Sequence, residues 1–374
     1  MAVQYSPGLE DKEAGPATRS DSLISNADIA RLEKDGDQAL KFITDRVEGE
    51  AIVINAETNR RLLRKIDLHI MPLMCIIYGL NFLDKTTLSY ASIMGLQTDL
   101  NLVGSDYQWL SSIFYFGYLA WEFPANRLLQ LLPLAKFSAF NVIMWGIVLT
   151  LFSVTSNWSG AMAIRFFLGL FESAVTPGFA LFTTQWYTRK EQGFRTSIWY
   201  CFNGFAQIFG GLVAYGIAHG AETHGFSVAP WKIIFIFTGT LTIVVGITFL
   251  VIMPDSPLST HWLTEHERVL VLERVRINQQ GIGNKKWKMY QFKEALLDPM
   301  VWAFAAFALL SDIPNGGITN FFSLLLKSFG YTSQESLLYG TPAGAVEIVA
   351  LLASGYLGDR LGQRIGEGAL LFQP

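Results

Sequence analysis

The sequence from residue 165 to residue 178 reads Arg165-Phe-Phe-Leu-Gly169-Leu-Phe-Glu172-Ser173-Ala-Val-Thr-Pro177-Gly178. It lies inside a mostly apolar stretch, residues 160–186, which is long enough to cross a bilayer as a helix. The charges of Arg165 and Glu172 are two helical turns apart, so they project from the same face, about 10 Å apart along the axis. A charge in hydrocarbon costs at least about 2.5–3.5 kcal/mol. Each charge therefore needs either a structural ion pair with a neighbouring helix or a bound third group.

The composition points to a membrane protein. Hydrophobic residues make up 51% of the 374 residues and aromatic residues 14%, and the apolar residues gather in runs of about 20. The formal net charge is −3, and no basic patch with interleaved aromatic residues predicts a nucleic-acid partner. The two cysteines and five histidines show no metal-ligand spacing. No nucleophile–base set predicts an enzyme, so we expect neither catalytic activity, nor a cofactor, nor a metal.

Four parts are predicted along the chain, which we expect to fold as an all-α integral membrane protein. They are a cytosolic, largely disordered tail (1–65), a six-helix bundle (66–253), a cytosolic central loop with an amphipathic helix (254–298), and a partial second bundle of two helices and a loop motif (299–374). The eight expected membrane spans are 67–91, 107–129, 134–155, 160–186, 195–218, 231–253, 300–326 and 334–357.

The basic residues set the expected orientation. Arg60, Arg61, Arg64 and Lys65 directly precede the first span, and basic residues concentrate on the cytosolic side of membrane proteins. We therefore place the N-terminus in the cytosol.

An internal repeat also emerges. About 60 residues separate the start of span one from Asn126-Arg127, and about 60 separate the start of span seven from Asp359-Arg360, which is the layout of a transporter with two repeated bundles.

A layer of buried charges is the candidate site. Asp84 and Lys85 in the first span lie about 7 Å outside its midpoint, in the same outer half of the membrane as Arg165 and Glu172. In a functional site, Lys85 and Arg165 would hold an anionic substrate. Asp84 and Glu172 would carry protons, because a low-dielectric surrounding favours the neutral form of a carboxylic acid. In the alternative interpretation the four charges are a neutralised tetrad that only fixes helix packing.

Span seven offers further candidates. Asn315 and Asn320 are expected to line the cavity, and Pro314 with Gly316-Gly317 is expected to break the helix there.

Several motifs are similar to those of a known family. They are Gly355-x-x-x-Asp359-Arg360-x-Gly362-x-Arg364, its degraded copy Asn126-Arg127, the stretch from Arg165 to Gly178, and Leu83-Asp84-Lys85-Thr86-Thr87. With them the sequence, from about Arg64 to Arg364, resembles the major facilitator superfamily, and within it the fungal allantoate permease group of the anion:cation symporter branch.

The resemblance implies alternating access by two six-helix bundles and proton-driven uptake of small organic anions, such as allantoate and ureidosuccinate, by a monomer in the plasma membrane. It assigns proton coupling to Asp84 and Glu172, and substrate binding or its linkage to protons to Lys85 and Arg165. The residues assigned to a cytosolic gating motif are Asn126, Arg127, Gly355, Asp359, Arg360, Gly362 and Arg364.

The number of spans departs from the family. Eight of the usual twelve are expected up to residue 374, so the chain is interpreted as C-terminally truncated. Three alternatives stay open: a non-transporting truncated isoform, a membrane nutrient sensor of the same family, or a relative that carries another carboxylate of the nicotinate or pantothenate type.

Overall fold

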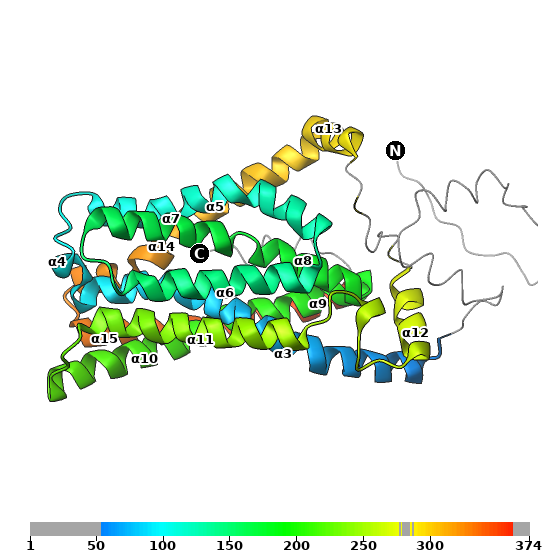
Figure 1. Cartoon of the computed structure of the whole chain (residues 1–374), viewed down its shortest axis with the longest axis horizontal. Coiled ribbons are helices and arrows are strands. Elements are labelled where there is room, and N and C mark those ends of the chain that lie inside the picture. The colour runs from blue at the N-terminus through cyan, green and yellow to red at the C-terminus, as the bar shows by residue number, and fades with distance from the viewer. Residues whose placement is uncertain (1–53, 277, 279–284, 286–287, 362–374) are drawn as a thin grey trace, which may run out of the picture.

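The computed structural model describes residues 54–276, 278, 285 and 288–361. In these parts of the chain the structure is helical throughout, and the long helices run side by side (Figure 1). Helices α12 and α13 lie at one end of the molecule, and α4 and α15 lie at the opposite end. We call these the α12 end and the α15 end.

The helices of the first bundle follow the chain in order. They are α3 (Ala56–Ala91), extended by a π-helix (Ser92–Leu96) and α4 (Gln97–Asp99), then α5 (Asp106–Leu131), α6 (Leu134–Phe152), α7 (Trp158–Glu172), α8 (Val175–Trp186), α9 (Arg189–Tyr200), α10 (Phe202–His224) and α11 (Pro230–Ile252). After a 3-10 turn (Pro257–Ser259) come α12 (Glu265–Arg276), α13 (Met289–Leu297), α14 (Pro299–Ser328), α15 (Ser333–Leu338) and α16 (Thr341–Leu361).

Seven helical stretches in the described part are long and apolar enough to cross a membrane. The eighth expected span, 107–129, corresponds to α5, which has 26 residues and packs within the same bundle against α7. It is not among the seven, because tyrosines, tryptophans and Glu122 take the place of aliphatic residues along it. The chain is an integral, multi-pass membrane protein.

Three boundaries differ from the expectations. The first helix begins at Ala56, so residues 56–65 of the expected tail are helical, and residues 1–53 of it lie outside the described residues. The fourth span is two helices, α7 and α8, which are separated at Ser173–Ala174. The expected break in span seven is wrong, because α14 continues through Pro314. Neighbouring groups can take up the backbone groups that a proline frees in a membrane helix.

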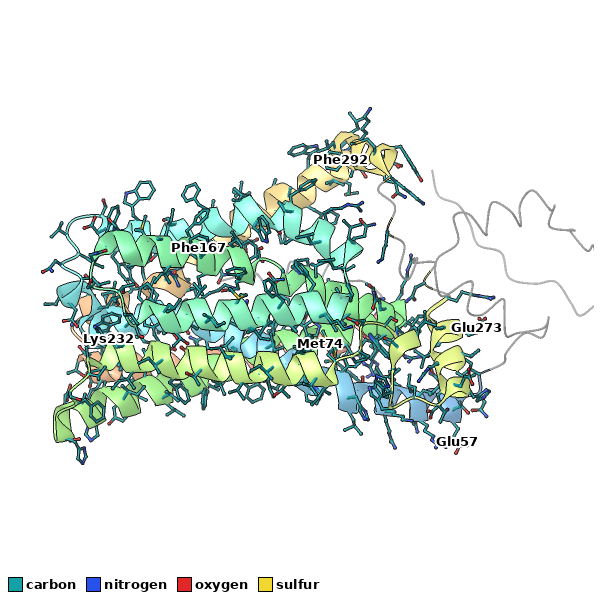
Figure 2. All side chains as sticks on the ribbon, in the orientation of Figure 1. Glu57, Met74, Phe167, Lys232, Glu273 and Phe292 are labelled. Carbon is teal, nitrogen blue, oxygen red and sulfur yellow. The ribbon has the colours of Figure 1, made fainter. Side chains whose placement is uncertain are left out.

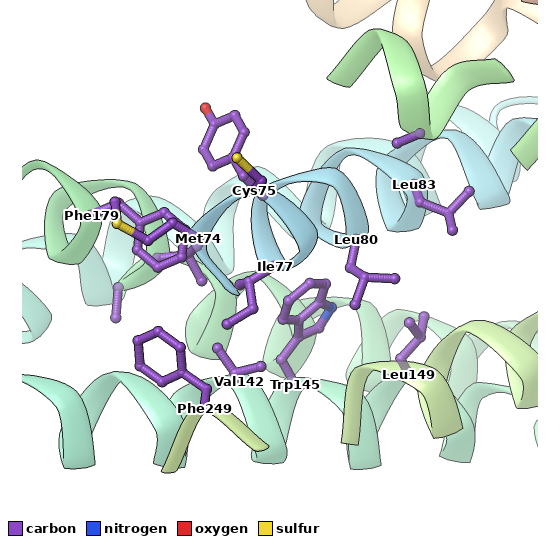
Figure 3. Packing of buried hydrophobic residues seen from close by; sticks show 14 of the residues in the cluster. Met74, Cys75, Ile77, Leu80, Leu83, Val142, Trp145, Leu149, Phe179 and Phe249 are labelled. Carbon is purple, nitrogen blue, oxygen red and sulfur yellow. The ribbon is translucent and has the colours of Figure 1, made fainter. Parts of the chain in front are cut away.

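Helix α3 lies at the centre of the core. It packs against α9, α10, α11 and α14, and Figure 3 shows Ile77 and Leu80 facing Val142 and Trp145 of α6. All four of these side chains are buried. Because α3 is surrounded on several sides, polar side chains on its half nearer the α15 end meet groups on other helices.

A close backbone contact joins α5 and α7. A Cβ atom on Gly117 would lie 2.1 Å from the Phe166 carbonyl oxygen, and one on Gly169 would lie 2.0 Å from the Phe114 carbonyl oxygen. Glycine at both positions lets the two backbones touch, as small residues do between membrane helices. This contact sets where the charged face of α7 lies.

At the α12 end, polar contacts attach α12 to the first bundle. Lys65 Nζ lies 2.7 Å from Glu267 Oε2, and Arg274 pairs with Glu191. The ring of His69 stacks on that of Trp262, with 4.3 Å between their centroids. These contacts hold the start of α3 and the start of α9 against the segment that follows α11.

Candidate functional site

An ion pair between α3 and α7 forms the centre of the site. Lys85 Nζ lies 2.8 Å from Glu172 Oε1, and the Glu172 side chain is 0% exposed. The ammonium also donates a hydrogen bond to Asn81 Oδ1, one helical turn earlier, at 2.7 Å. Lysine has three N–H donors, so one remains beyond these two partners.

Asp84 is buried next to this pair. Trp145 Nε1, on α6, donates a hydrogen bond to Asp84 Oδ2 at 2.9 Å, while Oδ1 accepts none from the described residues. Asp84 also interacts electrostatically with Arg165, Lys85 and Glu172. The carboxylate is therefore shared among charges on two helices and oriented by a third.

Arg165 is buried with an incomplete set of partners. Its side chain is 1% exposed, its Nε donates to the Leu110 carbonyl oxygen at 3.5 Å, and its guanidinium lies 5.0 Å from the centre of the Phe114 ring. Nη1 has no hydrogen-bond partner among the described residues. A buried charged group that lacks partners is costly, so a guanidinium in this state suits an anionic ligand.

The structure thus brings together the four charges expected to form one layer. Glu172 interacts with Lys85, Asp84 and Arg165, and all four side chains lie within the first bundle. The formal charges sum to zero. The arrangement can hold one added anion without a net charge if one of the two carboxylates is protonated at the same time.

The two asparagines of α14 lie in different surroundings. Asn320 is buried, and its Nδ2 donates to the Tyr115 hydroxyl at 3.1 Å, while its backbone carbonyl oxygen accepts from the Tyr107 hydroxyl at 2.9 Å. Asn315 is exposed, and the contact that its side chain accepts within the described residues is a long one, 3.4 Å, from Thr319 Oγ1 of its own helix. Asn320 therefore joins α14 to α5, whereas Asn315 is not brought to the buried charges.

The residues of the expected gating motif make contacts of two kinds. Asn126 Nδ2 donates to the Glu122 carbonyl oxygen at 2.9 Å, and Arg127 contacts Gln130, both within α5. In the second copy, Asp359 Oδ2 accepts from the Phe194 backbone N–H of α9 at 3.1 Å.

Two further residues of that copy are described. A Cβ atom on Gly355 would lie 2.3 Å from Ser197 Oγ, so α16 packs tightly on α9 there. Arg360 Nη1 lies 3.5 Å from the Tyr356 hydroxyl. Gly362 and Arg364 lie outside the described residues.

Several groups that contact the site residues were not predicted from the sequence. Asn81 precedes Lys85 by four residues, which is a detectable helical spacing. Trp145 lies 61 residues from Asp84 along the chain, and no local pattern indicates that its indole reaches that carboxylate. The same holds for Phe114 beneath Arg165 and for the hydroxyls of Tyr107 and Tyr115 on Asn320.

A bundle of membrane-spanning helices with charged side chains buried between them is typical of a membrane transporter. Residues 74–371 match the sequence profile of the family described as Major Facilitator Superfamily. The chain belongs to this superfamily.

Relatives in two yeasts share much of the sequence. The chain is 45% identical over 351 residues to an uncharacterized transporter of Schizosaccharomyces pombe, covering 93% of this chain and 68% of the relative. It is 39% identical over 352 residues to the allantoate permease of Saccharomyces cerevisiae, covering 93% and 64%. A thiamine pathway transporter of the same yeast is 31% identical, covering 96% and 70%. The chain therefore spans about two thirds of the length of these relatives.

A solved structure shares the fold. A bacterial homolog of the human lysosomal transporter Spinster, in an inward-facing and unoccupied conformation, superimposes with a TM-score of 0.57 at 19% sequence identity. The match covers 78% of this chain and 62% of that one.

Proposed function

We propose that this protein takes up small organic anions together with protons. The observation that carries the proposal is the buried set of two cations and two carboxylates, in which Lys85 is paired with Glu172 at 2.8 Å and Arg165 keeps an unpartnered N–H group among the described residues.

Charge balance links the two cargoes. Without substrate, the ionised set sums to zero. An added anion would leave one uncompensated negative charge in a low-dielectric site, which is expensive. Protonation of Glu172 removes that charge and also releases Lys85 to bind the anion. Proton and anion then favour each other's binding, and by linkage the coupling is reciprocal.

The substrate class follows from the groups available and from the relatives. Arg165 offers a planar fork of N–H donors that suits a carboxylate, and Lys85 adds a point charge. Asn320, the buried one of the two α14 asparagines, offers an amide group that matches a ureido group. Together with the 39% identity to an allantoate permease, this supports ureido acids such as allantoate and ureidosuccinate.

Transport would proceed by alternating access. In this proposal the protein is a monomer in the plasma membrane with its N-terminus in the cytosol. The motif residues of α5 and α16 then control opening at the α12 end. The contact of Asp359 with the Phe194 backbone N–H, 3.1 Å, supports this role because it joins an α16 side chain to α9.

The test is uptake of radiolabelled allantoate by cells that express the protein, with and without a proton gradient. We expect the gradient to drive uptake, and Glu172→Gln to lower it at least tenfold and remove its dependence on the gradient. Glu347→Gln is the matched control, because Glu347 is a partly buried carboxylate of α16 outside the charge layer.

Two results would contradict the proposal. Uptake by Glu172→Gln that still follows the proton gradient would exclude Glu172 as the coupling residue. A wild-type protein that is correctly inserted but takes up no carboxylate would favour the non-transporting alternatives.

A further inference from the structure

A basic stripe runs along the first turns of α3, away from the buried charge layer. Glu57, Arg60, Arg61, Arg64 and Leu68 are all exposed, and their spacing puts them on one face of the helix. We call these five residues the α3 stripe. The opposite face packs into the protein through Leu62, Ile66 and Ile70, which are buried. The stripe is therefore held facing outward.

The three arginines of the stripe lack protein partners in the part of the chain that the structure describes. Neighbouring charges are paired: Lys65 with Glu267 at 2.7 Å, and Asp67 with Arg195 at 3.2 Å. No ion pair among the described residues involves the three guanidinium groups of Arg60, Arg61 and Arg64.

A hollow of about 430 Å³ opens along the stripe. It is lined by Arg60, Arg61, Arg64 and Lys65 together with Glu57, Leu68 and His69. All seven lining residues belong to α3, so the hollow is open, and two of its side chains are held in place: the His69 ring stacks on Trp262 and Lys65 is paired with Glu267. With Lys65 already paired, the three arginines face a single lining carboxylate, Glu57, which favours an anionic occupant. Figure 2 shows Glu57 and Glu273 both at the α12 end of the molecule.

The position of the hollow along α3 matches a membrane surface. Leu68 is 75% exposed and lies where α3 enters the apolar part of the bundle, so its side chain suits the acyl boundary. Arg64 lies about 6 Å beyond Leu68 along the axis and Arg60 about 12 Å. The headgroup layer of a bilayer is about 5–8 Å thick on each side. Arg64 therefore falls within that layer, and Arg60 and Arg61 lie just beyond it.

We propose that the hollow binds the phosphorylated headgroup of an anionic membrane lipid, drawn from the leaflet at the α12 end, with an acyl chain running along Leu68. Guanidinium forks bind phosphate oxygens in pairs, and basic clusters directly beside a membrane span attract anionic lipids. A soluble phosphate would satisfy the arginines but would leave Leu68 uncovered.

The proposal can be tested by titrating the purified full chain in detergent with a short-chain phosphatidylinositol bisphosphate, followed by calorimetry. The variant is R60Q/R61Q/R64Q. The matched control is K285Q/K288Q/K293Q, which removes three positive charges from the segment around α13. We expect the arginine variant to raise the Kd at least tenfold and the lysine variant to change it less than twofold. Replacing the three arginines by lysine should cost severalfold, because charge remains but the paired hydrogen bonds are lost.

Several outcomes would overturn the proposal. Equal losses in the arginine and lysine variants would show attraction to charge without a site. Binding of free inositol trisphosphate as tight as that of the lipid would assign the hollow to a soluble anion. Lipid binding that appears only after removal of residues 1–53 would make that acidic segment the occupant. Thermal unfolding checks that each variant is folded, and R60Q/R61Q serves as the milder variant if the triple variant is not.

Discussion

At the residue scale, the hydrogen bond from Trp145 to Asp84 ties the charge layer to α6. It is 2.9 Å long and buried, and the other carboxylate oxygen accepts no bond from the described residues. Hydrogen bonds to charged groups contribute about 1.5–3 kcal/mol. We therefore expect Trp145→Phe to destabilise ionised Asp84 by about this amount. The pH profile of uptake should move to higher pH, because the ionised form of Asp84 has lost a hydrogen bond that favoured it.

The control for this prediction is Trp231→Phe. Trp231 is as fully buried as Trp145 and also donates to an aspartate, Asp99 Oδ2, at 2.7 Å, but it lies outside the charge layer. The two variants lose the same ring volume. Uptake assays across pH, with thermal unfolding beside them, separate the two effects. An equal pH shift in both variants would show that Trp145 has no special relation to Asp84.

The sequence was informative about charges and less so about their neighbours. Asp84, Lys85, Arg165 and Glu172 could be placed in one layer, because helical rise and span limits fix depth, and the structure brings them together. Which atoms pair could not be predicted, because rotation of α7 about its axis and the reach of Trp145 depend on packing across helices. Asn315, expected beside Asn320, is exposed for the same reason.

At the element scale, the backbone contact between α5 and α7 positions the site. We expect Gly169→Ala to destabilise the protein by about 1–3 kcal/mol, as overpacking does, because the new Cβ would lie 2.0 Å from the Phe114 carbonyl oxygen. The new Cβ atom would push α7 away from α5, and this shift of α7 should also weaken the Lys85–Glu172 pair. Gly216→Ala is the control, since a Cβ there meets nothing within 4 Å. Thermal unfolding in detergent measures both, and an equal change in the two variants would refute the packing argument.

The attachment of α12 predicts an acid-sensitive contact. Partial burial alone would raise the pKa of Glu267, but hydrogen bonds from Lys65 Nζ at 2.7 Å and from the Thr264 backbone N–H hold it below its usual value. Such a group stabilises the fold fully above its unfolded pKa of about 4.3, and the contribution is lost as pH falls through the lower, folded value.

The test compares wild type with Glu267→Gln. We expect the variant to be less stable at pH 7 by about 1 kcal/mol or less, since the pair is partly exposed, and the difference to vanish as pH falls well below 4. Thermal unfolding at several pH values measures the gap. A gap that stays constant down to low pH would show that the charge of Glu267 contributes nothing.

Helix limits were predicted well where apolar runs are uninterrupted and poorly at their edges. The start of α3 at Ala56 was missed, because its first turns are polar and gain stability from α12, which lies far along the chain. The expected break at Pro314 is absent, because α14 continues through that residue. A proline in the sequence does not show whether neighbouring groups take up the backbone carbonyl oxygen that it leaves without a donor. The interruption between α7 and α8 was missed although the sequence carries a signal for it: Pro177 is the third residue of α8, and a proline has no N–H to continue a preceding helix.

At the scale of the whole molecule, the first bundle and the helices after it meet along α3, α5, α9 and α10. Near the α15 end, the Ser323 backbone N–H donates to Ser89 Oγ at 3.1 Å in a buried position, and Asn320 meets Tyr107 and Tyr115. Near the α12 end, Asp359 and Gly355 of α16 contact α9. Alternating access requires at least one of these sets of contacts to open during each cycle.

A disulfide between Ser89→Cys and Ser323→Cys would test this requirement. Cys75 and Cys201 are first replaced by alanine, and a protease site is placed between α12 and α13, so that the two halves separate on a gel unless cross-linked. We expect oxidation to link the halves in high yield without substrate. Allantoate at low pH should lower the yield, because it favours the state in which these helices part. Oxidation should also stop uptake, and a reductant should restore it.

The single variant Ser89→Cys controls for oxidation itself, because it cannot form the link but carries the same reactive thiol on α3. If the linked protein transported at the full rate, the contact between α3 and α14 would stay closed throughout the cycle, and the two halves would separate at other contacts. If the yield ignored substrate and pH while the link still blocked uptake, opening would occur at this end without being driven by the charge layer. Proton coupling would then have to act through contacts at the α12 end.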